Sequence, residues 1–372
     1  MIKRELEGKI RKFLGTENAI ILFGARQTGK TTLLENLMKN KDNVLWYNLD
    51  DTKDAEKFRV LLEYPEDYLD ENTNYLVIDE AQQMEDIGRE LKVLHDKYKR
   101  TKLQIIATGS SSFDLANIVN EPMTGRKWEF QMQPVTFSEM CEYHGLEKEK
   151  SLLEKRLIYG YYPKVVTSSE SSARDNLSSL ANSILYKDVL KWGNIRKSTK
   201  IEDLLKALAY QIGSTVNYTE IASLIELDKI TVEKYINLLE QAFIIFRLNT
   251  FSRNLRNEIK AQRKIYFYDL GIRNAVIDKF DKLENRDDEG KLFENFIICE
   301  MIKKRDLRSY YYWRSVKQQE VDLVELVNGK TNAYEIKWSP ERFPKIPKYF
   351  IEKYLPLNMK IINRENFDQF LI

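Results

Sequence analysis

The chain contains few of the residues from which disulfide frameworks and zinc sites are built. Among its 372 residues are two cysteines, Cys141 and Cys299, and two histidines, His95 and His144. Two cysteines so far apart in the sequence exclude a disulfide framework and fit a reducing compartment. So small a number of histidines also argues against zinc clusters and histidine-dependent catalytic triads.

Long apolar runs and an excess of charge of one sign are missing as well. The longest apolar runs, such as residues 19–23 and 75–78, are only as long as a strand, so we expect no membrane span. The N-terminal stretch has the pattern of an amphipathic helix without an uninterrupted apolar core, so we expect no signal peptide and a cytoplasmic protein. Because 59 Lys and Arg nearly balance 57 Asp and Glu, a nucleic-acid partner can be argued only from local patches.

What is present is enough apolar material for more than one folded domain. Hydrophobic residues make up 43% of the chain and aromatic residues 12%, which excludes disorder as the dominant state. At roughly 150 residues per domain, the length predicts two or three domains.

The first motif that carries chemistry is a glycine-containing loop. The apolar run at 19–23 leads into Gly24-Ala25-Arg26-Gln27-Thr28-Gly29-Lys30-Thr31-Thr32, and leucines at helical spacing follow. The pattern G-x-x-x-x-G-K-T between a strand and a helix is that of a phosphate-binding loop, whose N–H groups bind phosphate oxygens. We therefore expect this segment to bind ATP, with Lys30 at the β- and γ-phosphates and Thr31 as a ligand of Mg²⁺. The alternative is an ordinary glycine turn before a helix.

Two carboxylates at the end of a second apolar run complete the expected nucleotide site. Residues 75–78 are followed directly by Asp79 and Glu80. We expect Asp79 to hold Mg²⁺ through water and Glu80 to polarise the attacking water. Adjacent carboxylates that end a strand also occur in purely structural settings.

Two further features are candidates for contact with the γ-phosphate. A third strand, expected at 103–108, leads into Ser110 and Ser111, which either sense the γ-phosphate or form a serine-rich turn. Arg126 precedes an alternating strand at 128–132. It is a candidate to stabilise charge on the transferring phosphoryl group, in cis or from a neighbouring subunit of a homo-oligomer. The alternative is a solvated loop arginine.

Taken in order with later segments, these motifs resemble a large group of bacterial and archaeal AAA-type ATPases whose C-terminal half is a domain of unknown function. The resemblance covers nearly the whole chain and rests on ILFGARQTGKTTL, YLVIDEAQ, IIATGSSS, TGRKWEFQMQPVTFSEM, YGYYPKVV, KIYFYDLGIRNAV, LFENFIICE, YYWRSVKQQEVDLV and AYEIKWS. It implies an AAA-like three-layer α/β sandwich at 1–150. An extra strand should lie between the phosphate-loop strand and the strand that ends in Asp79.

The middle of the chain is expected to be helical. By analogy with AAA-like ATPases, residues 151–200 should form a helical lid over the nucleotide. Residues 201–284 show three short helices followed by a strand, which is the order of a winged helix-turn-helix. The third helix, expected at 229–241 behind Asp228 as its N-cap, carries lysines and glutamates in balance. We therefore favour packing or protein contacts over DNA reading for this helix.

A more basic stretch follows the third helix. It comprises Arg253, Arg256, Lys260, Arg263 and Lys264, opposed by Glu258. If this region contacts a phosphate backbone, we expect the contact there.

A β-hairpin is expected in the C-terminal third, because Asn328-Gly329 lies between two β-rich runs. A two-residue turn places Asp322 opposite Glu335 and Glu320 opposite Lys337, with all four side chains on one face. Opposed carboxylates repel each other. We therefore expect Asp322 and Glu335 to bind a divalent cation, Mg²⁺ or Mn²⁺, with Lys337 nearby.

An Asp followed by Glu-x-Lys on the adjacent strand resembles the PD-(D/E)xK nuclease fold. The resemblance implies a restriction-endonuclease-like α/β domain at 285–372 that acts on DNA. Asp322, Glu335 and Lys337 would be catalytic, and Glu294 on the preceding helix would add a carboxylate. The sequence departs from the pattern at Val321, where the pattern has a proline. The alternative is an edge hairpin with a charged solvent face.

The sequence thus predicts a Mg²⁺-dependent ATPase coupled, through the lid and the winged helix, to a nuclease-like C-terminal domain. The alternative function is an ATP-driven signalling or regulatory switch. Its C-terminal domain would bind a partner without cleaving nucleic acid.

Overall fold

The computed structural model describes residues 1–110, 123–190, 198–252, 262–341 and 346–372. The chain divides into two compact units. Unit 1 comprises Met1–Pro134 and Gln241–Phe243, and unit 2 comprises Val135–Glu240 and Ile244–Ile372.

Unit 1 is built on a five-stranded parallel sheet with the order β2-β3-β4-β1-β5. Its strands are β1 (Ala19–Phe23), β2 (Val44–Asn48), β3 (Tyr75–Asp79), β4 (Gln104–Gly109) and β5 (Lys127–Gln131). Strand β4 pairs with both β1 and β3. The expected extra strand between the phosphate-loop strand and the strand that ends in Asp79 is therefore confirmed.

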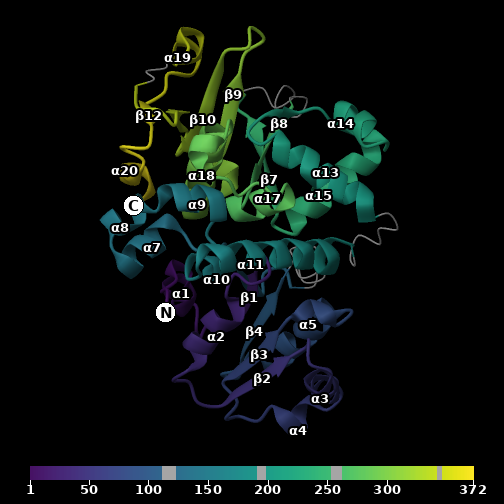
Figure 1. The fold of residues 1–372 in the computed structure, drawn as a ribbon. Coiled ribbons are helices and arrows are strands. Elements are labelled where there is room, and N and C mark those ends of the chain that lie inside the picture. Colours follow the sequence, from purple (N-terminus) through teal and green to yellow (C-terminus); the bar gives the residue numbers. More distant parts are fainter. Residues whose placement is uncertain (111–122, 191–197, 253–261, 342–345) are drawn as a thin grey trace. The chain divides into compact units, whose positions relative to one another are not determined.

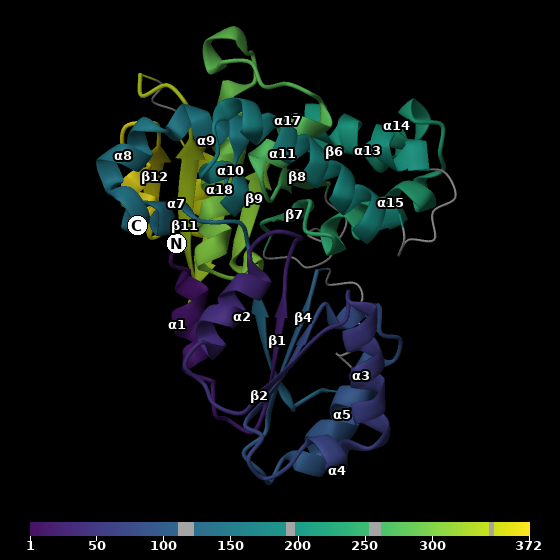
Figure 2. The ribbon, with the colours of Figure 1, turned by 60° about the horizontal axis from the view of Figure 1, so that its bottom comes forward.

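Helices cover both faces of this sheet, as a parallel sheet requires (Figure 2). They are α1 (Glu5–Arg11), α2 (Lys30–Met38), α3 (Thr52–Glu63), α4 (Pro65–Tyr68) and α5 (Ile87–Tyr98), and a 3-10 helix spans Ala81–Gln83. Ile10 of α1 and Leu33 of α2 belong to one apolar cluster, and Phe58 of α3 and Leu91 of α5 belong to the other. Because the strands are parallel, the carboxyl ends of β1, β3 and β4 meet at one edge of the sheet, where ligands bind in such folds.

Unit 2 contains a mixed seven-stranded sheet with the order β12-β11-β10-β9-β7-β8-β6 (Figure 1). The strands are β6 (Thr215–Val216), β7 (Ile245–Thr250), β8 (Arg263–Phe267), β9 (Tyr310–Arg314), β10 (Glu320–Val327), β11 (Lys330–Ile336) and β12 (Asn358–Ile362). Strand β7 pairs in parallel with β9, through Asn249 and Tyr311. The sheet therefore continues across the domain boundary that the sequence suggests after residue 284.

The helices of unit 2 precede, interrupt and follow these strands. They are α7 (Phe137–His144), α8 (Leu146–Ser151), α9 (Leu153–Tyr159), α10 (Pro163–Val166), α11 (Glu170–Ser183), α13 (Ser198–Tyr210), α14 (Tyr218–Leu224), α15 (Lys229–Gln241), α17 (Leu270–Val276), α18 (Glu289–Lys304), α19 (Lys348–Tyr354) and α20 (Asp368–Leu371). A π-helix spans Ile184–Leu190, and 3-10 helices span Leu283–Asn285 and Leu307–Ser309. Within the described ranges, no helix combines the length and the apolar character needed to cross a membrane.

Three helices and a strand follow one another as the sequence predicts for a winged helix, and the structure adds a second strand, β8. Helices α13, α14 and α15 precede the antiparallel pair β7–β8. The expected N-cap of α15 is confirmed, since Asp228 Oδ1 accepts from the backbone N–H of Thr231 at 2.8 Å. The assignment of this segment as a winged helix stays a prediction.

The C-terminal hairpin has the predicted register. Val327 pairs with Lys330, and Leu323 pairs with Tyr334. Asn328 and Gly329 both have positive φ, at 50° and 76°, which suits the tight turn of a two-residue hairpin.

Candidate active site

The phosphate loop runs from the end of β1 into α2, and close packing against Met132 determines its path. Gly24 has φ 155°, and a Cβ there would lie 2.1 Å from the carbonyl oxygen of Met132. Gly29 has φ 96° and precedes the first turn of α2. Both positions therefore require glycine. The loop holds the predicted residues Gly24, Ala25, Arg26, Gln27, Thr28 and Gly29, and Lys30, Thr31 and Thr32 form the first turn of the helix.

The ammonium group of Lys30 lies inside this loop. Its Nζ donates to the carbonyl oxygens of Gly24 at 2.9 Å and Ala25 at 3.0 Å, and the side chain is buried. The Thr28 hydroxyl closes the loop further by donating to Ala25 at 2.8 Å. A cation held by weak carbonyl ligands can exchange them for phosphate oxygens with little rearrangement.

Asp79 joins the loop helix to two strand ends. Its Oδ2 accepts from the Thr31 hydroxyl at 2.7 Å. Its Oδ1 accepts from the Thr108 hydroxyl at the end of β4 and from the backbone N–H of Glu80 at 3.1 Å. The carboxylate is 2% exposed and meets Thr31, the predicted Mg²⁺ ligand. Hydroxyl and carboxylate oxygens are the hard donors that Mg²⁺ prefers, so these two residues fit that ion.

Glu80 is held by a residue that the sequence analysis passed over. Gln82 Nε2 donates to Glu80 Oε2 at 2.5 Å and to the Ser110 hydroxyl at 3.0 Å. Gln82 is 2% exposed, and among the described residues its Oε1 atom is buried without a hydrogen-bond partner. The structure therefore brings Glu80 and Ser110 together through Gln82, whereas Ser111 lies outside the described residues. In the sequence, only the position of Gln82 two residues after Glu80 indicates that its side chain can reach this site.

Arg126 lies away from the phosphate loop. Its carbonyl accepts from the N–H of Ala19, at the start of β1, whereas the loop follows the end of that strand. Its guanidinium donates to both carboxylate oxygens of Asp96, at 2.8 and 3.2 Å, which lowers the pKa of Asp96. A strand of five residues, spanning about 13 Å at the usual rise, separates the two places. Action of Arg126 on the nucleotide of its own chain does not fit this geometry, and action on a neighbouring subunit stays a prediction.

In unit 2, the hairpin brings three of the predicted C-terminal residues together. Lys337 Nζ lies 2.7 Å from Asp322 Oδ2 and 3.1 Å from Glu335 Oε2. The backbone N–H of Ile336 also donates to Asp322 Oδ2, at 2.8 Å. Burial, followed by the negative charge of Asp322, raises the pKa of Glu335 to about 8. One lysine therefore leaves the repulsion between these two carboxylates only partly compensated.

Glu294 lies in a neighbouring charge cluster that contains a second lysine. Lys264 Nζ contacts Glu294 Oε1 at 3.2 Å and Glu320 Oε1 at 2.5 Å, and the Tyr266 hydroxyl donates to Glu294 Oε1 at 2.6 Å. Burial lowers the pKa of Lys264, but the charges led by Glu294 outweigh it and hold that pKa well above the ordinary value.

The position of Lys264 in this cluster changes the interpretation of the basic stretch. Lys264 is 2% exposed, so it cannot supply the contact that this stretch was expected to make if the region met a phosphate backbone. It serves instead as the counter-ion of two partly buried carboxylates, Glu294 and Glu320. Arg253, Arg256 and Lys260 lie outside the described residues.

The C-terminal carboxylates fit a divalent cation only in part. Asp322 and Glu335 supply hard oxygen donors that suit Mg²⁺ or Mn²⁺. Within the described ranges, no group of three or more His, Cys, Asp or Glu side chains is arranged to hold a metal ion. Glu294, which the nuclease resemblance adds to the site, is paired with Lys264 instead.

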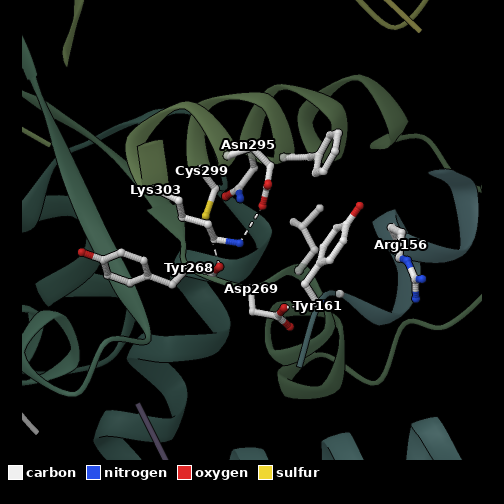
Figure 3. Close-up of a pocket in the computed structure, with 11 residues that line it drawn as sticks. Arg156, Tyr161, Tyr268, Asp269, Asn295, Cys299 and Lys303 are labelled. Carbon is white, nitrogen blue, oxygen red and sulfur yellow. Dashed lines mark hydrogen bonds and ion pairs between the residues drawn. The ribbon is translucent and has the colours of Figure 1, made fainter. Parts of the chain in front are cut away.

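A further cluster of buried charges in unit 2 has a structural role (Figure 3). Lys303 Nζ contacts Glu300 Oε1 at 2.6 Å, and Glu300 Oε2 accepts from the N–H of Phe137 at 2.7 Å. Asp269 Oδ2 accepts from the N–H of Tyr161 at 2.6 Å. The cavity between them holds about 10 Å³, which leaves room for no more than one water molecule. These charges therefore fasten α18 and its neighbours to the preceding segments.

Comparison with known families divides the chain into three matched segments. Residues 16–141 match the family described as AAA domain, which agrees with the strand order and the loop of unit 1. Residues 150–283 and 289–370 match two domains of unknown function, DUF8612 and DUF4143. Unit 1 thus has an AAA-type P-loop fold, and the family matches give the rest of the chain no activity.

Related proteins extend over most of the chain. An uncharacterized protein of Haemophilus influenzae is 24% identical over 330 residues, which are 82% of this chain and 79% of that protein. An uncharacterized protein of Mycobacterium tuberculosis is 25% identical over 344 residues, which are 90% of this chain and 74% of that one. Among solved structures, the Walker-type ATPase PABY2304 of Pyrococcus abyssi is similar in fold, with a TM-score of 0.50 and 16% identity. The match covers 74% of this chain and 96% of that protein.

Proposed function

We propose that unit 1 binds ATP with Mg²⁺ and hydrolyses it. The observation that carries this proposal is the 2.7 Å contact between the Thr31 hydroxyl and the Asp79 carboxylate. This contact joins the phosphate-loop helix to the strand end that precedes Glu80. A glycine turn without a nucleotide would not need a buried carboxylate at this place. The match of residues 16–141 to the AAA domain supports the same function.

Each residue of the site has a role that its surroundings support. Lys30 would exchange the loop carbonyls for phosphate oxygens, and Thr31 with Asp79 would hold Mg²⁺. The bound ion would neutralise charge on the phosphates. Glu80 would accept a proton from the attacking water, and Gln82 would hold Glu80 in place.

A nucleotide titration tests this function directly. We expect the full chain to bind ATP in the presence of Mg²⁺ and to release phosphate, and Lys30→Ala to abolish both by removing the cation at the phosphates. Lys39→Ala, at the exposed end of the same helix, is the matched control and should behave as wild type. Equal ATP binding by wild type and Lys30→Ala would refute the proposal.

The second candidate function belongs to unit 2 and would be driven by the first. The convergence of Asp322, Glu335 and Lys337 favours metal-dependent hydrolysis of DNA phosphodiester bonds, with Lys337 stabilising negative charge. The pairing of Glu294 with Lys264 favours the alternative, an ATP-driven switch that binds a partner without cutting.

DNA incubated with the full chain, ATP and Mn²⁺ separates these two functions. Cleavage that is lost in Lys337→Met supports the nuclease. Intact DNA together with nucleotide-dependent self-association supports the switch.

A further inference from the structure

The N-terminal residues of the chain reach the phosphate loop through one side chain. Arg4 directly precedes α1. Its Nη1 donates to the carbonyl oxygen of Thr28 in the phosphate loop at 2.8 Å, and its Nη2 donates to the carbonyl oxygen of Gln133 at 2.6 Å. One guanidinium therefore connects three parts of unit 1: the chain start, the loop and the segment that follows β5.

We propose that Arg4 is a positioning residue of the phosphate loop, an inference that rests on the proposed ATP-binding function. In a planar trans peptide, the C=O and the following N–H point in opposite directions. Because Arg4 holds the carbonyl of Thr28, the N–H of Gly29 points away from Arg4 and is kept in one orientation. Phosphate loops bind their anion with such N–H groups. Arg4 thus fixes one donor of the anion site before the nucleotide arrives.

The packing beside Gly29 is not tight enough to hold this peptide by itself. A Cβ at Gly29 would lie 3.6 Å from the terminal methyl group of Met132 and 4.0 Å from Arg4 Nη1. A glycine with positive φ is otherwise free to reorient its flanking peptides. The hydrogen bond from Arg4 to Thr28 supplies the restraint that the glycine itself lacks.

The second bond of Arg4 extends the restraint to the segment behind the loop. Gln133 follows Met132, whose carbonyl approaches Gly24 too closely for any side chain there. A guanidinium is a planar fork that can serve two carbonyls at once, whereas a lysine ammonium acts as a point charge. We therefore expect Arg4→Lys to preserve only part of the effect.

Calorimetric titration with ATP and Mg²⁺ on the full chain tests the role of Arg4. The variants are made with and without Glu80→Gln, so that binding can be measured without hydrolysis. We expect Arg4→Ala to weaken ATP binding about tenfold, the effect of losing the one charge-assisted hydrogen bond that reaches the phosphate loop, and Arg4→Lys to recover part of it. In steady state, KM should rise while kcat stays within about twofold, because Arg4 does not touch the attacking water. Arg11→Ala, an exposed arginine of α1 paired with Glu7, is the matched control and should bind as wild type.

The outcomes separate this inference from the function on which it rests. A wild-type protein that binds no ATP overturns the proposed function, and this inference with it. Wild-type binding together with unchanged binding by Arg4→Ala overturns the inference alone. Arg4 is a structural residue, and the inference is wrong, if two results are found together. Arg4→Ala would destabilise the nucleotide-free protein by as much free energy as it takes from ATP binding, and Arg4→Lys would restore neither.

Discussion

The side-chain amide of Gln82 links the Glu80 carboxylate to the Ser110 hydroxyl, with its nitrogen 2.5 Å from one and 3.0 Å from the other. An ionised carboxylate can only accept hydrogen bonds, so it dictates which end of the amide faces it. The carbonyl end of Gln82 therefore points elsewhere, as a buried acceptor with no partner among the described residues.

We predict that Gln82→Ala lowers kcat for ATP hydrolysis by about tenfold or more, because a hydrogen bond to a charged group is lost. ATP affinity should stay unchanged, since Gln82 does not belong to the phosphate loop. Phosphate release and calorimetric binding, measured on the same protein, check both halves. Gln83→Ala, the neighbouring glutamine that contacts Asp50, is the control. A rise in kcat would mean that Gln82 restrains Glu80 instead of positioning it.

Glu80→Gln should separate binding from turnover. The amide cannot accept the proton of the attacking water, so we expect hydrolysis to fall about a hundredfold or more. Asp79 and Thr31 remain, so ATP and Mg²⁺ should bind as in wild type. Hydrolysis that continues at the wild-type rate would assign the general base to another residue.

The arrangement of the candidate nucleotide site was largely predictable from the sequence because its residues are contiguous in short motifs. The loop at 24–32 and the pair Asp79–Glu80 each lie at the end of an apolar run, so strand order alone brings them together. The hairpin register was predictable for the same reason, since Asn328-Gly329 permits only one pairing.

Long-range side-chain pairing was not predictable. Arg4 donates hydrogen bonds to Thr28, which lies 24 positions further along the chain, and to Gln133, which lies 129 positions further along. No local sequence pattern predicts such contacts. Lys264 looked like a member of a basic surface stretch, because composition does not reveal that Glu294 and Glu320 approach it from other elements. The pairing of β7 with β9, which continues one sheet, could not be predicted from the sequence either, since helices separate these strands along the chain.

For Arg126, mixed oligomers can distinguish the remaining role from a structural one. If Arg126 acts on a neighbouring subunit, mixing Arg126→Ala with Glu80→Gln should restore some hydrolysis, since one interface then combines an intact arginine with an intact base. If its function is to hold Asp96, Asp96→Ala should reproduce the phenotype of Arg126→Ala, and mixing should restore nothing. Phosphate release from titrated mixtures decides between the two.

Metal-free stability should fall as the pH rises toward 8, in part because of Glu335. Its pKa is raised from 4.5 to about 8 in the folded protein, by burial first and by Asp322 second. Between these values the folded state binds a proton that the unfolded state has released, so each step upward in pH favours unfolding. Glu335→Gln removes this titration and should flatten the decline. Thermal unfolding in metal-free buffer from pH 5 to pH 8 checks it, and an unchanged slope in Glu335→Gln would assign the decline to other buried carboxylates.

Whether the hairpin binds a divalent cation can be tested with Mn²⁺. Asp322 and Glu335 share Lys337 as their counter-ion, and a divalent cation would compensate their charge more fully than one ammonium does. We predict that Asp322→Asn weakens Mn²⁺ binding at least about tenfold, because one of two carboxylate ligands is lost. ATP hydrolysis should stay nearly unchanged, because the carboxylate lies in unit 2 and the nucleotide site in unit 1.

Calorimetric titration with Mn²⁺ should be done with Lys30→Ala in every protein, so that the nucleotide site contributes no heat through bound ATP. Glu365→Gln, an exposed acid of the same unit, is the matched control and should bind Mn²⁺ as the parent does. The side-chain amide that Asp322→Asn introduces can still accept the hydrogen bond of the Ile336 N–H, so the strand should keep its register. The unfolding midpoint of the variant should therefore not fall below that of the parent. Relief of the repulsion with Glu335 should instead raise that midpoint when no metal is present. Equal Mn²⁺ binding by parent and Asp322→Asn would refute the proposed metal site and, with it, the proposed nuclease function. Lys337 would then be the permanent counter-ion of both carboxylates.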